Sequence, residues 1–500
     1  MATVIFTTST PLDPIRKLGE FDISSVRLRT DSDFVADGTL ASGTAATLSL
    51  RGSGFGTNSA GLRNGTAVVT SVEFSINGEV VLRVDGARFT GAKLADWLSD
   101  WYLPAFADGL FIGDDVMTLT DLPDHAAGYG GNDRLDGRGG NDILDGYSGN
   151  DMLLGGAGDD ALSGSSGNDT LLGGDGNDKL FSGDGDDLIV GGVGSDQASG
   201  GAGTDTFAYS SMLRKQAHVR DLTWAKAVSG LEAPEEEVLQ GFERIAFLDG
   251  TLHFDPADTA GQVWRLYGAA FGRSAETTGL SGWVDVLDGG AASLVDAASG
   301  FIGSAEFALR YGDLDDAGFV TRLYANVLGR APDAAGLDHW TAHLARGASR
   351  ADLLVGFSES AEYRLNTDET IADGLWTVDR EAVDVLRCYV TILDRAPDAG
   401  GLSSWIAARN NGLTNAEMAT GFIASTEFQT RFGALSDRDF VERMYQTALD
   451  RQADAAGLAA WVSLLDSGAA KRSDVVQGFA YSDEMTMKLL PLVSDGIAFA

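Results

Sequence analysis

Aspartate recurs at every ninth position through the middle of this chain, and this row of carboxylates is the part of the sequence best suited to chemistry. The row comprises Asp133, Asp142, Asp151, Asp160, Asp169, Asp178, Asp187, Asp196 and Asp205. A glycine lies two residues before each aspartate, and an apolar residue lies two residues after it. Glycine-rich turns that present carboxylate and carbonyl oxygens suit Ca²⁺, which binds about six to eight oxygen atoms. Mg²⁺ requires a tighter octahedral shell, so we expect this row to bind Ca²⁺.

The elements that position these aspartates must repeat with the same period. A period of nine residues fits neither an α-helix, with about 3.6 residues per turn, nor the simple alternation of a strand. It fits a glycine-rich turn of about six residues followed by a strand of about three, because glycine supplies the positive-φ conformations that such turns need. The apolar residue of each strand would point inward and stack with its neighbours into one column. We therefore expect a parallel β-roll over residues 113–209.

The pattern G-G-x-G-x-D-x-U-x, in which U is apolar, resembles the RTX or hemolysin-type calcium-binding repeat. The resemblance implies that two repeats make one full coil and that each Ca²⁺ lies between the loops of repeats n and n+2. The nine repeats would then form 9 − 2 = 7 internal sites, or about seven ions. Asp115 and Asp124 continue the register upstream, at 133 − 18 and 133 − 9, and we expect weaker sites there.

The charge of this segment agrees with a metal-dependent fold. Residues 113–209 contain 19 Asp and no Glu, against only Arg134, Arg138 and Lys179, which gives a net charge of −16. Seven Ca²⁺ ions would supply +14 and nearly neutralise it. Without metal, a glycine-rich segment that repels itself buries too little apolar surface to offset its chain entropy. We expect metal binding and folding of this segment to be one process.

Composition limits the partners of the whole chain. Its net charge of −37 argues against nucleic acids and anionic membranes as partners. The single cysteine, Cys388, cannot form an intramolecular disulfide, and bound calcium is an alternative means of stabilising an extracellular protein. No apolar run is long enough to cross a bilayer, so we expect no transmembrane segment.

The resemblance also implies a route of export. RTX proteins typically leave the cell through type I secretion machinery, which uses an uncleaved C-terminal signal. Residues 489–500 fit such a tail, since small and apolar residues follow Asp495. Residues 1–18 have no basic start and no long apolar core, so we expect no N-terminal signal peptide. Because calcium is scarce in cytoplasm, we expect a secreted protein that is extracellular or associated with the cell surface.

A longer repeat fills residues 257–488 in four copies, at about 257–312, 313–370, 379–433 and 434–488. Each copy contains a Tyr, an Arg six residues later, a Trp sixteen residues after the Tyr, and a Ser-x-Glu near its end. The apolar spacing predicts amphipathic helices, and the block resembles a helical domain of unknown function found in tandem in secreted bacterial RTX proteins. We expect Tyr and Trp in the core and each Arg in a buried pair with the Glu of its own copy, as in Arg273 with Glu306; a ligand site is the alternative.

The segments on either side of the roll are predicted to be β-rich. Residues 1–112 form a β-rich module with a hairpin around Asn77-Gly78 and a short helix at 94–101. Residues 210–256 are expected to cap the roll, with a hairpin that turns at Asp249-Gly250. Within this segment, residues 210–237 include an acidic run and are expected to be a solvated loop.

The sequence lacks the signatures of the enzymes that carry RTX repeats. Neither H-E-x-x-H nor G-x-S-x-G occurs. His339 and His343 have the spacing of two zinc ligands on one helix face, but a third ligand is missing, and two surface histidines are the favoured interpretation. An unrecognised active site in the N-terminal module remains the third choice.

Taken together, the sequence predicts a multidomain α+β protein with a parallel β-roll between a small β-rich module and an α-helical tandem array. We expect a calcium-binding, non-enzymatic protein with a surface-layer, matrix or adhesion role that involves self-assembly. The alternative is a glycan-binding or ligand-binding extracellular module that recognises cell-surface polysaccharide.

Overall fold

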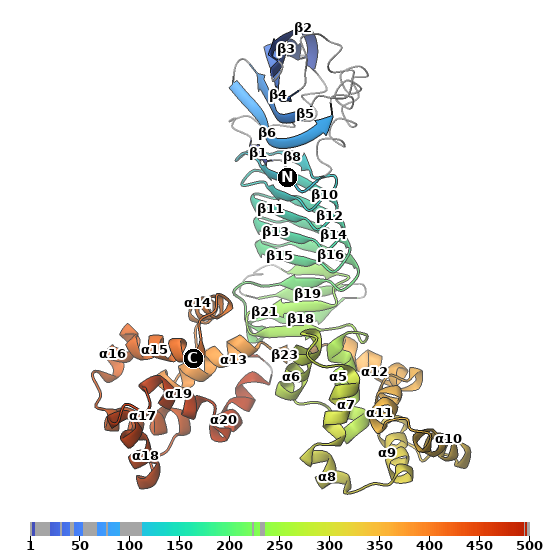
Figure 1. The fold of residues 1–500 in the computed structure, drawn as a ribbon, viewed down its shortest axis with the longest axis vertical. Coiled ribbons are helices and arrows are strands. Elements are labelled where there is room, and N and C mark those ends of the chain that lie inside the picture. The colour runs from blue at the N-terminus through green and yellow to red at the C-terminus, as the bar shows by residue number, and fades with distance from the viewer. Residues whose placement is uncertain are drawn as a thin grey trace. The chain divides into compact units, whose positions relative to one another are not determined.

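The computed structural model describes the chain in several stretches (Figure 1). Side chains are described for residues 113–222, 225–230, 236–494 and 496–497, and backbone alone for the strands at 3–5, 21–30, 33–40, 45–53, 68–76 and 79–90. The chain divides into two compact units. The first comprises Met1–Tyr209 and Ala217–Glu243, and the second comprises Ser210–Gln216 and Arg244–Ala500.

The nonapeptide repeats form a β-solenoid of about five turns, whose stacked coils are visible in Figure 1. One sheet contains β7 (Val116–Thr118), β9 (Arg134–Asp136), β11 (Met152–Ala157), β13 (Thr170–Asp175), β15 (Leu188–Val193) and β17 (Thr206–Ala208). The other contains β8 (His125–Ala127), β10 (Ile143–Ser148), β12 (Ala161–Ser166), β14 (Lys179–Asp184) and β16 (Gln197–Ala202). Neighbouring strands are parallel, and Leu153 lies opposite Leu171, so one full coil spans two repeats. The predicted parallel roll is confirmed.

The strands are longer than the three residues that the sequence predicted. β10 to β16 each have six residues, because pairing between coils continues past the apolar position. In β11 and β13, for example, Gly156 pairs with Gly174 and Ala157 with Asp175. Part of the predicted turn is therefore strand.

The apolar residue of each repeat points inward and builds the core of the roll. Its side chains are completely buried in eight of the nine repeats, and Ala198 is nearly so. Full burial of one leucine stabilises a fold by about 1.5–3 kcal/mol relative to exposure. A column this thin still needs additional stabilisation between its coils.

The glycine two residues before each Asp is required for two physical reasons. Gly149, for example, has a φ of +125°, which L-residues rarely adopt. A Cβ on Gly149 would also lie less than 3.0 Å from the carbonyl oxygen of Gly131 in the preceding coil. This column is therefore glycine in every repeat, because both the backbone conformation and the stacking distance exclude a side chain.

The backbone strands at the N-terminus form an antiparallel series in the first unit. They are β1 (Thr3–Ile5), β2 (Phe21–Thr30), β3 (Asp33–Leu40), β4 (Ala45–Ser53), β5 (Val68–Ile76) and β6 (Glu79–Thr90). β5 and β6 pair from Ile76 opposite Glu79, as the predicted hairpin requires. The turn residues themselves and the predicted helix at 94–101 lie outside the described residues.

Three further strands follow the roll in the first unit, where the sequence predicted a solvated loop. They are β18 (His218–Asp221), β19 (Lys226–Ser229) and β20 (Glu237–Gln240). β20 pairs in parallel with β16, with Leu239 opposite Ala198, and β19 and β18 follow it in antiparallel order. Ala227 and Val228 of β19 are completely buried, so the loop prediction was wrong. Segments this short carry too few residues for their alternation to be recognised.

The second unit begins with a small antiparallel sheet. β21 (Arg244–Phe247) and β22 (Gly250–His253) form the predicted hairpin, but Phe247 pairs with Gly250, so the turn is Leu248-Asp249, one residue earlier than expected. β23 (Leu375–Val378), which comes from the middle of the helical region, then pairs with the free edge of β22. The Asp249 carboxylate accepts hydrogen bonds from the amides of Arg214, at 2.9 Å, and Ile497, at 2.5 Å.

Four helices form each copy of the longer repeat (Figure 1). Copy one contains α5 (Thr259–Phe271), α6 (Thr277–Asp288), α7 (Leu294–Ile302) and α8 (Ala305–Tyr311), and copy two contains α9 (Asp316–Leu328), α10 (Ala334–Ala345), α11 (Arg350–Ser358) and α12 (Ala361–Ala372). Copy three contains α13 (Arg380–Cys388) with a π-helical extension Tyr389–Leu393, α14 (Ala399–Asn410), α15 (Asn415–Ala424) and α16 (Thr426–Phe432). Copy four contains α17 (Asp437–Leu449), α18 (Ala455–Asp466), α19 (Arg472–Ala480) and α20 (Asp483–Val493). Within the described residues, no helix is long and apolar enough to cross a membrane.

The four copies combine as two pairs. The helices of copies one and two share one hydrophobic core, and those of copies three and four share another. Equivalent bonds recur in the two pairs: Arg350 binds Asp316 at 2.7 Å, and Arg472 binds Asp437 at 2.7 Å. Their separation is 472 − 350 = 122 residues, so the structural repeat is a double copy.

In each copy, the Tyr, Arg and Glu that recur in the sequence lie in contact with one another. Arg273 makes a two-point bond to Glu306, at 2.8 and 2.7 Å, and lies over the ring of Tyr267, 5.3 Å from its centre. The corresponding pairs are Arg330–Glu362, Arg395–Glu427 and Arg451–Glu484. The predicted pairing is confirmed, but these arginine side chains are between 25% and 51% exposed, so the predicted burial was wrong. The Tyr hydroxyl explains the glycine that follows, because a Cβ on Gly279 would overlap the hydroxyl of Tyr267.

Candidate metal centre

The aspartates of the roll form a continuous ladder of hydrogen bonds. The backbone amide of each Asp donates to Oδ1 of the Asp 18 residues later, as Asp133 does to Asp151 at 2.7 Å. The same bond joins every such pair from Asp115 to Asp205, at distances between 2.7 and 3.1 Å. One carboxylate oxygen of each repeat therefore has a fixed structural role, and its orientation is set by the preceding coil.

The second carboxylate oxygen, Oδ2, has no such partner. In all nine predicted aspartates this atom is buried and receives no hydrogen bond from any described residue. Burying a charged oxygen without a partner is costly, and native proteins satisfy almost all such atoms. A regular row of these atoms indicates that something other than protein contacts them.

In several repeats, Oδ2 faces a cradle that contains a second oxygen. A Cβ placed on Gly137 would lie less than 3.0 Å from Asp142 Oδ2 and 2.6 Å from the carbonyl oxygen of Gly155. The equivalent cradles at Gly155, Gly164 and Gly173 have the same two kinds of oxygen. A carboxylate and a carbonyl therefore converge where glycine leaves room, and both are oxygen donors of the kind that Ca²⁺ prefers.

The remaining ligands would have to come from backbone. Among the described residues, no three His, Cys, Asp or Glu side chains gather in a way that could hold a metal ion. Carboxylate and carbonyl oxygens suit Ca²⁺, whereas imidazole and thiolate ligands suit transition metals. The predicted aspartates thus fit calcium, with Oδ2 and a glycine carbonyl as the protein oxygens available.

The electrostatics of the protein alone are unfavourable for the ionised form of several of these carboxylates. Burial raises the pKa of Asp133 to about 7, the Asp115 amide that donates to it opposes this rise, and the negative charge of Asp151 adds to it. The pKa values of Asp142 and Asp169 are raised to about 7 and that of Asp160 to about 6, with burial the main cause. A cation beside Oδ2 would favour the ionised form and remove this penalty.

The two upstream aspartates belong to the same ladder. The amides of Asp115 and Asp124 donate to Asp133 and Asp142, both at 2.7 Å. Asp124 differs from the others because its Oδ2 accepts hydrogen bonds from Thr120, at 2.9 Å from the amide and 2.7 Å from the hydroxyl. This oxygen has a protein partner, whereas Oδ2 of the nine aspartates from Asp133 to Asp205 has none among the described residues.

A second ladder was not predicted from the sequence. In seven of the nine repeats, the residue before the Asp uses its side-chain oxygen to accept the amide of the following coil, as Asn132 does from Asn150 at 2.7 Å. This ladder runs in the opposite sense to the first and lies on the exposed surface. Its signal is visible in the sequence, since these positions are Asn or Asp in seven consecutive repeats, from Asn132 to Asp186.

One repeat departs from the cradle pattern. Ser182 occupies the position that is glycine in the other eight repeats, and its side chain is completely buried. Its hydroxyl donates to the carbonyl oxygen of Gly200 at 2.8 Å. By analogy with Gly164, whose cradle contains the carbonyl of Ser182, the carbonyl of Gly200 belongs to the cradle of Asp187. A serine side chain therefore occupies this cradle.

The two histidines considered as zinc ligands lie on the surface. His339 and His343 of α10 are exposed, and each contacts the ring of Trp340, with centroid distances of 4.9 and 5.9 Å. They are not part of a cluster of three or more potential ligands in the described part of the chain.

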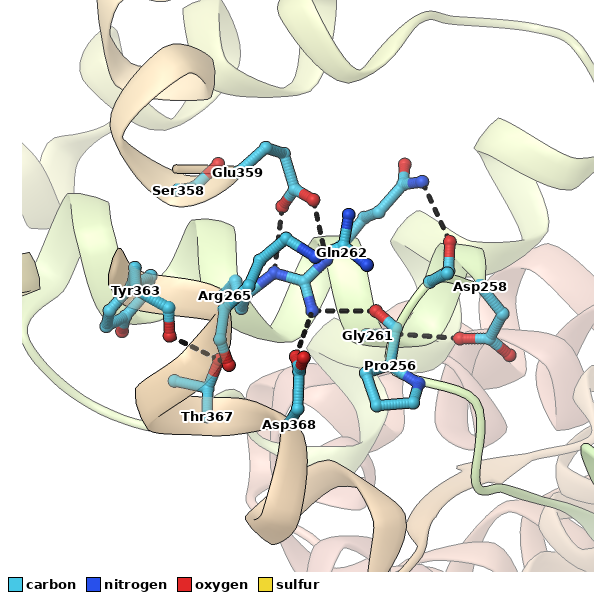
Figure 2. Close-up of polar contacts among 12 residues, drawn as sticks. Pro256, Asp258, Gly261, Gln262, Arg265, Ser358, Glu359, Tyr363, Thr367 and Asp368 are labelled. Carbon is cyan, nitrogen blue, oxygen red and sulfur yellow. Dashed lines mark hydrogen bonds and ion pairs between the residues drawn. The ribbon is translucent and has the colours of Figure 1, made fainter. Parts of the chain in front are cut away.

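The most buried charge of the helical region is structural. Arg265 of α5 is completely buried and makes a two-point bond to Glu359, at 3.0 and 2.6 Å, while its NH1 donates to the carbonyl of Pro256 at 2.7 Å (Figure 2). Asp368 lies 3.7 Å from the same guanidinium. The cluster joins α5 to the end of α11 and to α12, that is, copy one to copy two. All of the donors are directed at protein groups, so the cluster stabilises the pair of copies.

Two family models match the chain in the regions described above. The model of the RTX calcium-binding nonapeptide repeat (4 copies) matches residues 120–153, 128–162, 154–189 and 181–210. The model described as a domain of unknown function (DUF4214) matches residues 257–308, 298–366, 377–432 and 419–489. No curated protein matches the chain.

Proposed function

Because this chain carries RTX calcium-binding repeats followed by tandem DUF4214 domains, we propose that it is a secreted protein whose roll folds when it meets extracellular Ca²⁺. The row from Asp133 to Asp205 supplies the metal ligands, with about seven ions between the nine repeats, and Asp115 and Asp124 supply weaker sites. The folded protein has a non-enzymatic role in a surface layer, a matrix or adhesion.

The observation that carries the calcium proposal is the row of buried Oδ2 atoms without donors in the described residues. A single such atom could reflect local strain. A row of them in register, several of them beside a backbone carbonyl of the adjacent coil, supports a repeated ligand. Calcium fits because the donors are oxygens and because the segment carries a net charge of −16 that the protein does not compensate.

The location follows from the calcium that folding requires. Ion binding supplies the free energy that this glycine-rich segment lacks, so the roll remains unfolded where calcium is scarce. An unfolded segment is suited to passage through a narrow channel, which supports export by type I secretion machinery. Residues 489–493 form the last turn of α20, and they would be part of the proposed secretion tail 489–500.

The non-enzymatic role is supported by what the helical copies do with their polar residues. Their repeated Arg, Tyr and Glu bind each other, as Arg395 does with Glu427 and Tyr389, and they are used in packing. Repeated units on one chain can make several weak contacts at once, which strengthens attachment to a surface or to other copies of the protein. Such multivalent contact is the property that a matrix or adhesive component needs.

Calcium-dependent folding is tested with paired variants of the full chain. Circular dichroism and calcium titration compare the double variant Asp151→Ala/Asp169→Ala with Asp175→Ala/Asp184→Ala. Both remove two charges, but Asp151 and Asp169 are buried in the ladder, whereas Asp175 and Asp184 are exposed. We expect only the first variant to bind fewer ions and to need more calcium to fold. Equal behaviour of both variants would contradict the proposed ligands.

The proposed role is tested by light scattering in chelator and in millimolar calcium. Growth from an expanded monomer to ordered assemblies supports a surface-layer or matrix role. A compact monomer that binds cell-surface polysaccharide in calcium supports an adhesive or glycan-binding module. A compact monomer that neither assembles nor binds polysaccharide contradicts the proposed role but leaves the calcium proposal intact.

A further inference from the structure

The last aspartate of the sheet that contains β17 has no following repeat. Asp205 is completely buried, and its Oδ2 receives no hydrogen bond from the described residues. The repeat one full coil later would place a glycine at 218 and an aspartate at 223, but the sequence there leaves the repeat pattern. On the sequence alone, Asp205 should therefore lack a cradle of its own.

The ladder of hydrogen bonds nevertheless continues by one step. The amide of Asp205 donates to Oε2 of Glu243 at 2.8 Å. Every earlier step is an amide that donates to the next carboxylate, as Asp187 does to Asp205 at 3.1 Å. Glu243 thus occupies the place of the missing aspartate, although it lies outside the nonapeptide repeats.

The missing carbonyl is replaced in the same way. A Cβ on Gly200 would lie less than 3.0 Å from both Asp205 Oδ2 and the carbonyl oxygen of Gly241. This is the arrangement found at Gly137, where the two oxygens belong to Asp142 and Gly155. Gly241 therefore supplies the oxygen that the first glycine of a further repeat would supply.

The segment that carries these two residues is held firmly against the last coil. β20 pairs with β16 directly before it, with Leu239 opposite Ala198. Between Gly241 and Glu243, the ring of Phe242 is buried and packs edge-on against Phe207, with 5.6 Å between the ring centres. The positions of the carbonyl and the carboxylate are thus fixed by sheet pairing and by core packing.

We propose that Asp205, Gly241 and Glu243 form one further Ca²⁺ site at the end of the roll, and two of these three residues lie outside the repeats. This inference rests on the proposed function, and it raises the expected number of ions from seven to 7 + 1 = 8. The ion neutralises the paired charges of Asp205 and Glu243. It also joins the segment 238–243 to the last coil, so calcium adds to the sheet pairing and core packing that close the end of the roll.

The test is a calcium titration of the full chain with the variant Glu243→Gln. Glutamine keeps an oxygen that accepts the amide of Asp205 but removes the charge, so the ladder step is retained and the ion is lost. The matched control is Glu236→Gln, since Glu236 lies on the surface of the same segment, where it pairs with Arg220. We expect Glu243→Gln to bind one ion fewer than the wild type and Glu236→Gln to bind the same number.

Hydrogen exchange over residues 236–243 provides a second measurement that does not depend on counting ions. Calcium should slow exchange of this segment in the wild type and in Glu236→Gln but not in Glu243→Gln, while the central coils stay protected in all three. Equal stoichiometry and equal protection in the three proteins would overturn the terminal site and leave the other sites standing. A wild type that binds no calcium would instead overturn the proposed function itself.

Discussion

Replacing Ser182 by glycine should improve calcium binding, because this serine fills a cradle that is open in the other repeats. The Ser182 hydroxyl donates to the carbonyl oxygen of Gly200, which an ion in the cradle of Asp187 would otherwise contact. Calcium must break this hydrogen bond and displace the side chain before it can bind. Glycine at 182 removes both obstacles.

The expected gain in calcium affinity can be worked out from the hydrogen bond between Ser182 and Gly200 that the variant lacks. A hydroxyl–carbonyl hydrogen bond contributes a net of about 0.5–1.5 kcal/mol, which corresponds to a change of about two- to tenfold in the affinity of this one site. If the side chain blocks the ion completely, the variant instead binds one additional ion. Both results shift the calcium midpoint of folding to lower concentration, because ion binding and folding are linked.

The assay is a calcium titration that reports both stoichiometry and midpoint for Ser182→Gly and for the reverse change Gly164→Ser. Gly164 is the equivalent position one coil earlier on the same sheet, and a Cβ there would lie less than 3.0 Å from Asp169 Oδ2. We expect the two variants to shift the midpoint in opposite directions. A weaker site in Ser182→Gly would refute this reasoning, because it would mean that the hydroxyl is itself a ligand.

Three further predictions concern the roll and the helical pairs. In chelator, any folded roll should be most stable in acid. The pKa values of Asp133 and Asp142 are raised to about 7 in the folded state, so the folded state binds these protons more tightly than the unfolded state does. This stabilisation is complete below the unfolded pKa of about 4 and is lost as the pH rises through about 7. Circular dichroism in chelator across this range checks the sign, and a roll more structured at alkaline than at acidic pH would contradict it. Gly149→Ala should prevent calcium-induced folding of the roll, because Gly149 has a φ of +125° and lies against the carbonyl of Gly131. Gly356→Ala should instead stabilise its helix by about 0.5–1 kcal/mol, because Gly356 lies on an exposed helix face and its added Cβ would have nothing within 4 Å. Thermal melts of the two variants test the contrast. Arg265→Ala leaves Glu359 without its buried partner and should lower the free energy of unfolding in denaturant by about 3–5 kcal/mol. Arg273→Ala should lower it by about 1 kcal/mol or less, because its ion pair is partly exposed. Similar losses for the two variants would show that burial does not determine the energetic cost.

The roll could be predicted from the sequence because its geometry repeats with every ninth residue. The inward Leu, the glycine with positive φ and the Asp each answer a requirement of a single coil and its neighbour, so each leaves a column in the sequence. The strand length was less predictable. Pairs such as Gly156 with Gly174 extend the strands through residues whose type does not indicate a strand.

A cap on the roll was predicted, but the residues that replace the missing repeat could not be, because they do not keep the repeat spacing. Within a repeat, the cradle glycine and its aspartate are five positions apart, as in Gly200 and Asp205. In the closing segment, the two groups that replace them, Gly241 and Glu243, are two positions apart. The three-dimensional positions are equivalent while the sequence positions are not, so a search by period misses them.

The helical copies were predicted well in their local structure and less well in their grouping. N-cap aspartates such as Asp333 and Asp398 begin helices, because their side chains accept an amide of the first turn. The division into two pairs depends on contacts between copies, such as Arg265 of copy one with Glu359 of copy two. These partners carry no signal of their own until the copies are placed against each other.

The position of β23 has a consequence for the order in which the chain is made. β22 exposes a free edge until Leu375–Val378 pairs with it, and the buried ring of His253 reaches its second partner, Thr377, 124 residues later in the sequence. During synthesis from the N-terminus, copies one and two must therefore emerge before this sheet can be completed. An unpaired strand edge is a template for pairing with other chains. A fragment that stops at the end of α12, although it contains a complete pair of copies, leaves this edge open, whereas a fragment that extends through Val378 closes it.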